Sequence, residues 1–294
     1  MNTMLVKKKL LFVPILFGFC FLLLAQQSSA SDYHSPRTTA LGGAGHAGPL
    51  LNDSVMLNPS FTSFLPTYSI GLNYLTFNGP PGGLNSSPLR GRSYNISIQD
   101  GRNRIFQAGA AYTKREDGSM VHVSASRAVL KQLAFGVSGK FYFADKKRSG
   151  TGRDMSVSTS WIVSNFFQTA LIADNLFQSE SNFAHTMYRE YILGLKFNLN
   201  GILLVYFDPH ITPNAPSNHI YGFEGGLEFV FFSDLFVRLG VLRNATIPYL
   251  SERGKAYGLG FGWVAPRISL DFGLSRALDP VRATAYSVGA TVYF

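Results

Sequence analysis

The amino-acid sequence predicts an all-β fold, namely a transmembrane, antiparallel β-barrel of about 14 strands. Three observations support this prediction. An export signal stands at the N-terminus, apolar and polar residues alternate through most of the remaining chain, and short connections between predicted strands alternate with long ones. After the signal, no apolar run reaches the roughly 20 residues that a membrane helix requires.

Residues 1–30 are predicted to form a cleaved signal peptide. The basic residues 7–9 precede an apolar core at 10–25 and a small-residue cleavage site at 28–30. An uncleaved membrane anchor is the alternative, but Pro14 and the Ser-Ser-Ala exit favour cleavage. We therefore expect an exported protein in the outer membrane of a Gram-negative-type cell.

The composition narrows the class further. Cys20 is the only cysteine and lies in the predicted signal, so no disulfide is expected in the mature chain. The signal holds three of the 26 basic residues and none of the 17 acidic residues, which leaves a formal charge of +6. These charges form short groups rather than one basic stripe, which argues against nucleic acid binding. Few charged residues and 14% aromatic residues suit a barrel whose outer face meets lipid.

The segment from residue 133 to residue 143 shows the alternation that predicts the fold class. Phe135, Val137 and Phe141 fall on one face of a strand, whereas Ser138 and Lys140 fall on the other. The same period recurs many times along the chain. The predicted strands are 68–76, 92–99, 105–113, 120–129, 132–143, 154–163, 166–173, 188–198, 201–207, 219–231, 234–242, 255–264, 267–275 and 283–294.

The connections between these strands alternate in length, as they do in outer-membrane barrels with short periplasmic turns and longer external loops. A soluble β-sandwich would also show alternating strands, but it gives no reason for alternating loop lengths. The long connections are 77–91, 114–119, 144–153, 174–187, 208–218, 243–254 and 276–282, and the short ones are 100–104, 130–131, 164–165, 200, 232–233 and 265–266.

The final stretch, AYSVGATVYF, supports the same class. Tyr286, Val288, Ala290 and Val292 share one face, and the chain ends on Phe294. This resembles the C-terminal recognition strand of proteins inserted by the barrel assembly machinery, although Val292 takes the place of the usual aromatic residue. The resemblance implies that machinery and the outer-membrane lipid as partners.

The stretch TTALGGAGHAGPLLNDSVMLNPS, residues 38–60, looks at first like a phosphate-binding loop. It contains no lysine, it does not follow an apolar strand, and Pro49 and Pro59 interrupt any helix after it. A nucleotide site is therefore excluded. Glycine allows positive φ where a chain doubles back, and Asn58 is expected to cap the turn that Pro59 begins.

The same stretch resembles the N-terminal signature of the FadL-like outer-membrane family, which includes long-chain fatty acid transporters and PorV-type secretion proteins. In that family such a segment forms a plug inside a 14-stranded barrel. The resemblance implies a plug at residues 31–66 and a barrel at residues 67–294, with Ser60 in place of the usual alanine. A plain periplasmic linker is the alternative. The residues that match the plug motif are Gly42, Gly43, Gly45, Asp53, Asn58 and Pro59.

No catalytic motif is present, so we expect no enzymatic activity and no cofactor. The histidines are dispersed, and Asp208, His210 and His219 at their spacing are weak evidence for a metal site, so none is expected.

The polar faces of the predicted strands carry charges of both signs, which should point into the lumen because hydrocarbon excludes them. They either pair with one another and anchor the plug, or form a polar path for a ligand. The inner face at Gly258, Gly260 and Gly262 is bare, as expected for contact with the plug, a kink or a lateral gap. The predicted lumenal charges are Lys140, Glu190, Lys196, Glu224, Glu228, Arg238 and Asp271.

Two functions remain open from the sequence. The first is uptake or binding of a hydrophobic small molecule, with the plug shifting to open a path. The alternative is a structural or secretion role of PorV type, in which the barrel binds a protein partner. A transporter should carry an apolar groove in its external loops, and the candidates for one are Leu176, Phe177, Phe183, Ile247, Tyr249 and Leu250.

Overall fold

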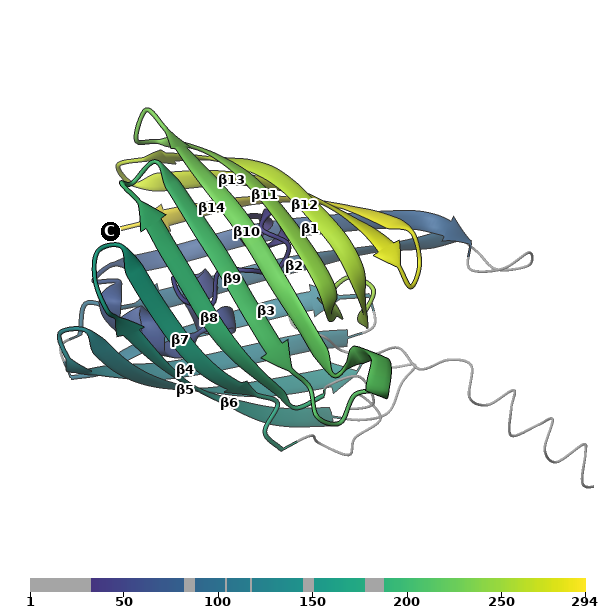
Figure 1. The fold of residues 1–294 in the computed structure, drawn as a ribbon, viewed down its shortest axis with the longest axis horizontal. Coiled ribbons are helices and arrows are strands. Elements are labelled where there is room, and N and C mark those ends of the chain that lie inside the picture. The colour runs from purple at the N-terminus through teal and green to yellow at the C-terminus, as the bar shows by residue number, and fades with distance from the viewer. Residues whose placement is uncertain (1–32, 82–87, 104, 117, 145–150, 178–187) are drawn as a thin grey trace, which may run out of the picture.

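The computed structural model describes residues 33–81, 88–103, 105–116, 118–144, 151–177 and 188–294, and it forms a closed barrel of 14 antiparallel strands (Figure 1). Each strand pairs with its neighbours in sequence, and the barrel closes where the first strand pairs with the last. The predicted fold class is confirmed. The predicted signal peptide, residues 1–30, lies outside the described residues.

Eight of the 14 strands are longer than the sequence pattern predicts, mainly at the end opposite the C-terminus. They are β1 (Tyr68–Pro81), β2 (Pro88–Asp100), β3 (Gln107–Arg115), β4 (Gly118–Leu130), β5 (Leu133–Ala144), β6 (Thr151–Ile162), β7 (Phe167–Asp174), β8 (Glu190–Leu199), β9 (Leu203–Ile211), β10 (Tyr221–Phe231), β11 (Leu235–Ile247), β12 (Glu252–Ala265), β13 (Ile268–Asp279) and β14 (Ala283–Tyr293).

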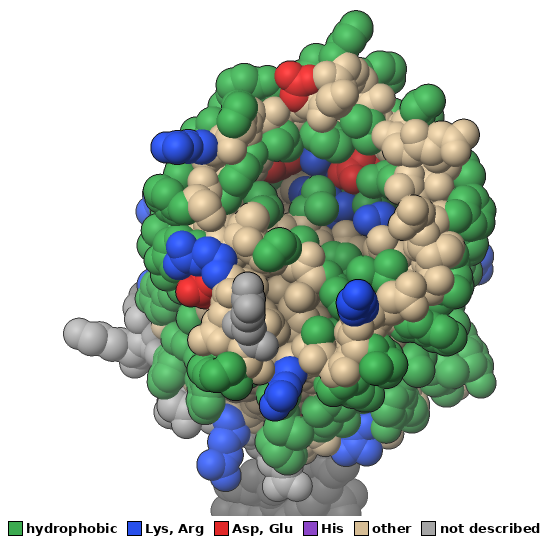
Figure 2. Space-filling model, turned by 90° about the vertical axis from the view of Figure 1, so that its left-hand side faces the viewer, with side chains coloured by type: hydrophobic (Ala, Val, Ile, Leu, Met, Phe, Trp, Pro, Cys, Tyr) green, Lys and Arg blue, Asp and Glu red, His purple; other side chains and the backbone are tan. Residues whose placement is uncertain are grey.

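Side chains alternate between the two faces of the wall as predicted. On β12, Tyr257, Leu259, Phe261 and Trp263 are exposed on the outer face, and the intervening residues face the lumen and are buried. Figure 2 looks into the end of the barrel at which the C-terminus lies. Hydrophobic side chains cover the outer wall, and acidic and basic side chains are visible inside the hollow. The outer face thus suits lipid, and the lumen holds the charge.

Several of the connections that the sequence pattern predicts to be long are short in the structure. Only residues 116–117 join β3 to β4, residues 248–251 join β11 to β12, and residues 280–282 join β13 to β14. The strands continue past their predicted ends with polar outward residues, because that part of the wall no longer faces hydrocarbon. At these ends the outward residues are polar and inward residues such as Ile247 and Ala277 are apolar, so the apolar-out, polar-in alternation that predicts a membrane strand is lost.

Residues 33–66 form an N-terminal segment that lies inside the barrel, drawn in purple in Figure 1. Its elements are the helices α2 (Pro36–Ala40) and α3 (Asp53–Leu57) and the 3-10 helix η1 (Pro59–Phe64). The first helix packs on the inner face of β11–β14, and η1 packs on β3–β6. No helix in the described residues has the length and apolar character needed to cross a membrane. A further short 3-10 helix, η3 (Ser217–His219), precedes β10.

Candidate functional site

Glycines on the inner wall give the N-terminal segment the space it needs. A Cβ atom at Gly240 would overlap the backbone of Leu41. Likewise, a Cβ atom at Gly258 would overlap the carbonyl of Thr39, and one at Gly273 that of Pro36. Wall and segment backbone are therefore in direct contact along β11–β13.

The bare inner face of β12 is explained by two kinds of contact. Gly258 and Gly260 lie against residues of the N-terminal segment, Ala40 among them. Gly262 instead makes room for the side chains of Arg238 and Asp271. Of the three interpretations offered by the sequence, close contact with the segment fits the first two glycines.

The glycines of the segment itself meet two demands at once. Gly42, Gly43 and Gly45 have φ values of 65°, 93° and 127°, which L side chains rarely adopt. A Cβ atom at Gly42 would also lie 2.6 Å from the backbone nitrogen of Val241. The chain doubles back here against the wall, and only glycine fits both the dihedral angle and the space.

A chain of buried ion pairs joins the segment to the wall. The Glu228 carboxylate of β10 accepts from Arg37 Nε at 3.2 Å and from Arg238 Nε at 2.6 Å. Arg238 also donates through Nη1 to Asp271 of β13 at 2.5 Å. Glu228, Arg37 and Arg238 are all nearly inaccessible to solvent. Three predicted lumenal charges therefore form one network, and Arg37 extends it into the segment.

Arg37 has two further partners. Its Nη2 atom donates to the hydroxyl of Tyr206 at 2.9 Å, and its Nη1 atom lies 3.8 Å from Asp53 Oδ2. Tyr206 in turn donates to Glu228 at 3.2 Å. Asp53, the acidic residue of the predicted plug motif, therefore joins the network through Arg37, which lies in the same N-terminal segment.

A second anchor lies at His46. The Asp208 carboxylate accepts from the backbone N–H groups of Gly45 at 2.7 Å and His46 at 3.0 Å, and it contacts His46 Nδ1 at 2.9 Å. Glu224 lies 3.6 Å from the same ring nitrogen. Burial by itself lowers the pKa of His46, but the hydrogen bond to Asp208 and the charges of Asp208 and Glu224 outweigh it and raise the pKa to about 9. His46 is therefore protonated at neutral pH.

These three side chains place potential ligand atoms within 4.8 Å of one another, a spacing that a metal ion can use. However, Asp208 Oδ2 accepts two backbone hydrogen bonds from the segment and contacts His46 Nδ1, so this carboxylate oxygen is already engaged by the segment. The geometry is that of an anchor for the segment.

Asn58 differs from its predicted role. Its side chain makes no capping hydrogen bond for η1. Instead, Nδ2 donates to the carbonyl of His46 at 2.6 Å and to Ser160 Oγ of β6 at 2.8 Å. The Ser60 hydroxyl donates to Asn58 Oδ1 at 2.6 Å and lies 2.7 Å from Ser160 Oγ. Asn58-Pro59-Ser60 thus fastens the far end of the segment to β6.

The remaining predicted charges also face the lumen. Lys140 of β5 donates to Asp174 at 2.7 Å, and Arg253 of β12 donates to Glu190 at 3.1 Å. Lys196 of β8 lies over the ring of Tyr206, with Nζ 5.7 Å from the ring centre.

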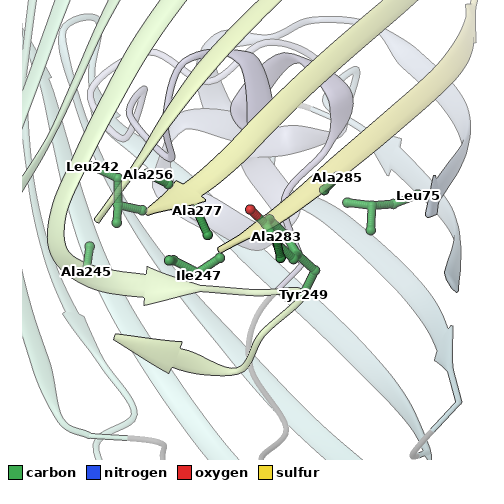
Figure 3. Close-up of a cluster of buried hydrophobic side chains, with 9 residues drawn as sticks. All are labelled: Leu75, Leu242, Ala245, Ile247, Tyr249, Ala256, Ala277, Ala283 and Ala285. Carbon is green, nitrogen blue, oxygen red and sulfur yellow. The ribbon is translucent and has the colours of Figure 1, made fainter. Parts of the chain in front are cut away.

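Apolar side chains gather inside the barrel near the end opposite the C-terminus (Figure 3). The turn at residues 248–251 folds toward them, and Arg115 of β3 holds it through Pro248 O at 3.0 Å and Ser251 Oγ at 2.7 Å. We call this group the apolar cluster. Its buried members are Leu75, Leu242, Ala245, Ile247, Tyr249, Ala256, Ala277, Ala283 and Ala285, with Phe77, Leu89 and Leu250 packed against them.

The predicted apolar loop groove is divided by the structure. Ile247 and Tyr249 belong to the apolar cluster, with Leu250 packed against it, although Ile247 ends β11 rather than lying in a loop. Leu176 and Phe177 lie beyond the end of β7 and are not part of the cluster. The backbone N–H of Phe177 donates to the Asp154 carboxylate, and the Phe177 residue is mostly exposed. Phe183 lies outside the described residues.

A partly open cavity lies between the segment and the loop end. It measures about 60 Å³ and is lined by residues of both the segment and the wall, including His46, Glu190, Glu224 and Arg253. A cavity known to bind benzene measures about 150 Å³, more than twice this volume.

Sequence reasoning missed several residues that make these contacts. Asp174 and Asp208 were assigned to loops, and Arg37, Tyr206 and Arg253 were not singled out. The period of two offered a signal, because Tyr206 and Asp208 share the inward face of β9.

The barrel architecture is shared with solved hydrocarbon channels and toluene transporters, and this likeness agrees with the predicted 14-stranded barrel fold. The CymD monoaromatic hydrocarbon channel matches with a TM-score of 0.66 at 12% identity, over 88% of this chain and 97% of that one. The toluene transporter TodX of Pseudomonas putida gives 0.61 at 12% identity, over 91% and 99% of the two chains. TbuX of Ralstonia pickettii, another toluene transporter, gives 0.60 at 12% identity, over 89% and 98%.

No family model matches this sequence, and no curated protein matches it. The solved neighbours are channels and transporters rather than enzymes.

Replacing Gly240 by valine should displace the N-terminal segment and leave the barrel intact, because the new side chain would overlap the backbone of Leu41. Trypsin cleavage at Arg37, which is buried, should become rapid in the refolded variant. Gly225→Val is the matched control, since a Cβ atom there lies 3.6 Å from the nearest atom, an ordinary contact. Equal protection of Arg37 in both variants would contradict the close contact.

Replacing Arg238 by glutamine should cost about 3–5 kcal/mol in the free energy of unfolding, because two carboxylates lose their shared partner in a buried site. Urea unfolding of the barrel refolded in detergent measures the loss. Arg243→Gln removes an exposed positive charge from the same strand and should change stability by less than about 0.5 kcal/mol. A similar small change for Arg238→Gln would show that the network adds little.

Proposed function

We propose that this protein takes up a hydrophobic small molecule across the outer membrane, and that residues 33–66 act as a movable plug. In this proposal residues 1–30 are the cleaved signal, residues 31–66 the plug segment and residues 67–294 the barrel. The observation that carries the proposal is the apolar cluster at the loop end of the lumen.

The apolar cluster faces the lumen, so contact with membrane lipid does not explain why these residues are apolar. Lumen-facing residues of outer-membrane barrels are ordinarily polar, because apolar residues are needed only on the lipid side. Here Leu242, Ile247 and Tyr249 point inward and lie at the loop end, where a solute from outside would arrive. An apolar solute gains from leaving water at such a surface.

The position of the segment supports a gating role. It lies between the apolar cluster and the other end of the barrel, and the cavity of about 60 Å³ beside it is too small for an aromatic ring. Passage therefore requires the segment or its neighbours to move. The anchors at Arg37 and His46 set the free energy that such a movement must overcome.

The titles of the structural neighbours indicate a class of substrate. They describe a monoaromatic hydrocarbon channel and two toluene transporters. We extend this class to the present chain, so toluene is the first substrate to test.

Ile247→Asp should reduce toluene uptake at least severalfold, because a charge in the apolar cluster makes it unfavourable for an apolar solute. Uptake is measured with labelled toluene in cells that lack their own hydrocarbon transporters. Phe177→Asp is the matched control: it adds the same charge at the loop end but outside the cluster, and uptake should be unchanged. Equal uptake by both variants and the parent chain would overturn the proposed route.

Movement of the plug can be tested with a reversible cross-link. The hydroxyls of Ser60 in η1 and Ser160 in β6 lie 2.7 Å apart, so a cysteine pair at these positions should form a disulfide. The oxidised pair should slow toluene uptake, and reduction should restore it. Each single cysteine serves as a control. Full uptake by the cross-linked protein would mean that this end of the plug stays in place during transport.

A further inference from the structure

On the outer face of four neighbouring strands, β13, β14, β1 and β2, the register aligns side chains in rows that run across the strands. In one row the register places Leu270, Ala290, Leu72 and Ile96 side by side. These residues point away from the lumen, and Leu72, Leu270 and Ile96 are exposed. This row belongs to the apolar band that meets hydrocarbon.

The rows change character toward the loop end. The next row contains Phe272, Val288, Tyr74 and Tyr94, in which the two tyrosine rings lie 5.1 Å apart. Tyrosines at this height are typical of the membrane–water interface.

Arginines lie directly beyond this belt. Arg92 aligns with Thr76 and Tyr286, and the last row runs Arg276, Thr284, Asn78 and Arg90. Three rows beyond the apolar row of Leu270 and Ile96, the outward residues are therefore polar or basic.

The surface is hollowed along this face. A hollow of about 860 Å³ is lined by the four arginines 90, 92, 276 and 282, together with Tyr74 and Tyr286. A second hollow of about 640 Å³ lies next to it and is lined by apolar residues that include Leu72, Ile96 and Val288. Tyr74 lines both hollows, so the charged part continues into the apolar part.

The arginines have little compensation within the chain. Glu116 lies 3.9 Å from Arg92, and both side chains are more than 60% exposed, so this pair is weak. In the described part of the chain, no carboxylate forms an ion pair with Arg90, Arg276 or Arg282. Four positive charges and one negative charge leave this hollow with an excess of three positive charges.

We propose that this face binds a phosphorylated, anionic lipid of the outer leaflet, with its phosphates on the arginines and its acyl chains along the apolar hollow. Arginine suits phosphate because its planar group donates two parallel hydrogen bonds. The loop end of the barrel faces outward, and the arginines lie just above the tyrosines, at the depth of lipid headgroups. The arginine columns on β13 and β2 are three strand spacings apart, about 14 Å, which accommodates a headgroup with two phosphates.

The test uses the full barrel purified in detergent, with diphosphoryl lipid A as the probe and native mass spectrometry to count bound lipid. Arg90→Gln, Arg276→Gln and Arg282→Gln together should weaken binding roughly tenfold or more, since each arginine at this exposed site is expected to contribute a few fold. The matched control removes three exposed positive charges at the opposite end of the barrel, by Arg127→Gln, Lys131→Gln and Arg267→Gln, and should bind as the parent chain does.

Other probes separate lipid from phosphate alone. Phosphatidylethanolamine should bind weakly, and inorganic phosphate at millimolar concentration should not displace the diphosphoryl lipid. Equal affinity in the arginine and control triples would overturn the proposal, as would displacement by free phosphate. Should the triple variant fail to insert, the single variants Arg90→Gln and Arg276→Gln are each expected to lose a few fold in affinity. The site is separate from the lumen, so toluene uptake is not its readout.

Discussion

The buried carboxylate of Glu228 is the contact on which the architecture of the lumen depends. It is inaccessible to solvent and accepts hydrogen bonds from Arg37 of the N-terminal segment and Arg238 of the wall. A buried charge is tolerated only when it is paired and hydrogen-bonded. The same holds for Asp208, whose Oδ2 atom is satisfied by the segment. The wall carries charges that the segment must balance, so neither part is complete without the other.

The wall holds the segment through two kinds of contact. Polar anchors come from β6, β9 and β10, and glycines against which the segment backbone rests directly occur on β11–β13 and also on β5 and β8, at Gly136 and Gly194. Hydrogen bonds and ion pairs fix the segment's position, and the close packing at the glycines excludes water from them. A polar contact shielded in this way is stronger than the same contact in water. Release of the segment must therefore break these polar contacts, whatever triggers it.

The sequence predicts the strand class and the inward face of charges such as Lys140 and Glu228, because a period of two assigns each side chain to one face. It does not predict their partners. Arg37 and Glu228 are 191 residues apart, and only the curvature of the closed barrel brings them together. The sequence pattern ends the predicted strand at residue 207, yet β9 continues through Asp208 and Pro209. The ladder between β8 and β9 has no pair at Asp208 or Pro209, and Leu195 N donates to the Asp208 side chain instead. Proline cannot donate a hydrogen bond to a neighbouring strand, so its presence in a sequence usually indicates the end of a strand. Here the Asp208 side chain replaces part of the missing backbone contact, which the sequence alone does not show.

Near the loop end, the faces of the wall exchange their character. On β13 and β14 the inward residues Ala277, Ala283 and Ala285 are apolar and buried, whereas the outward residues Arg276 and Thr284 are polar. A wall in hydrocarbon needs the opposite arrangement, so this part of the barrel stands above the membrane and encloses a small core of its own. The apolar cluster is thus a buried core that the turn at 248–251 shields from water. In the proposed function a hydrophobic solute that arrives from outside would reach this cluster before the charged network, so selection for apolar molecules would begin at the cluster.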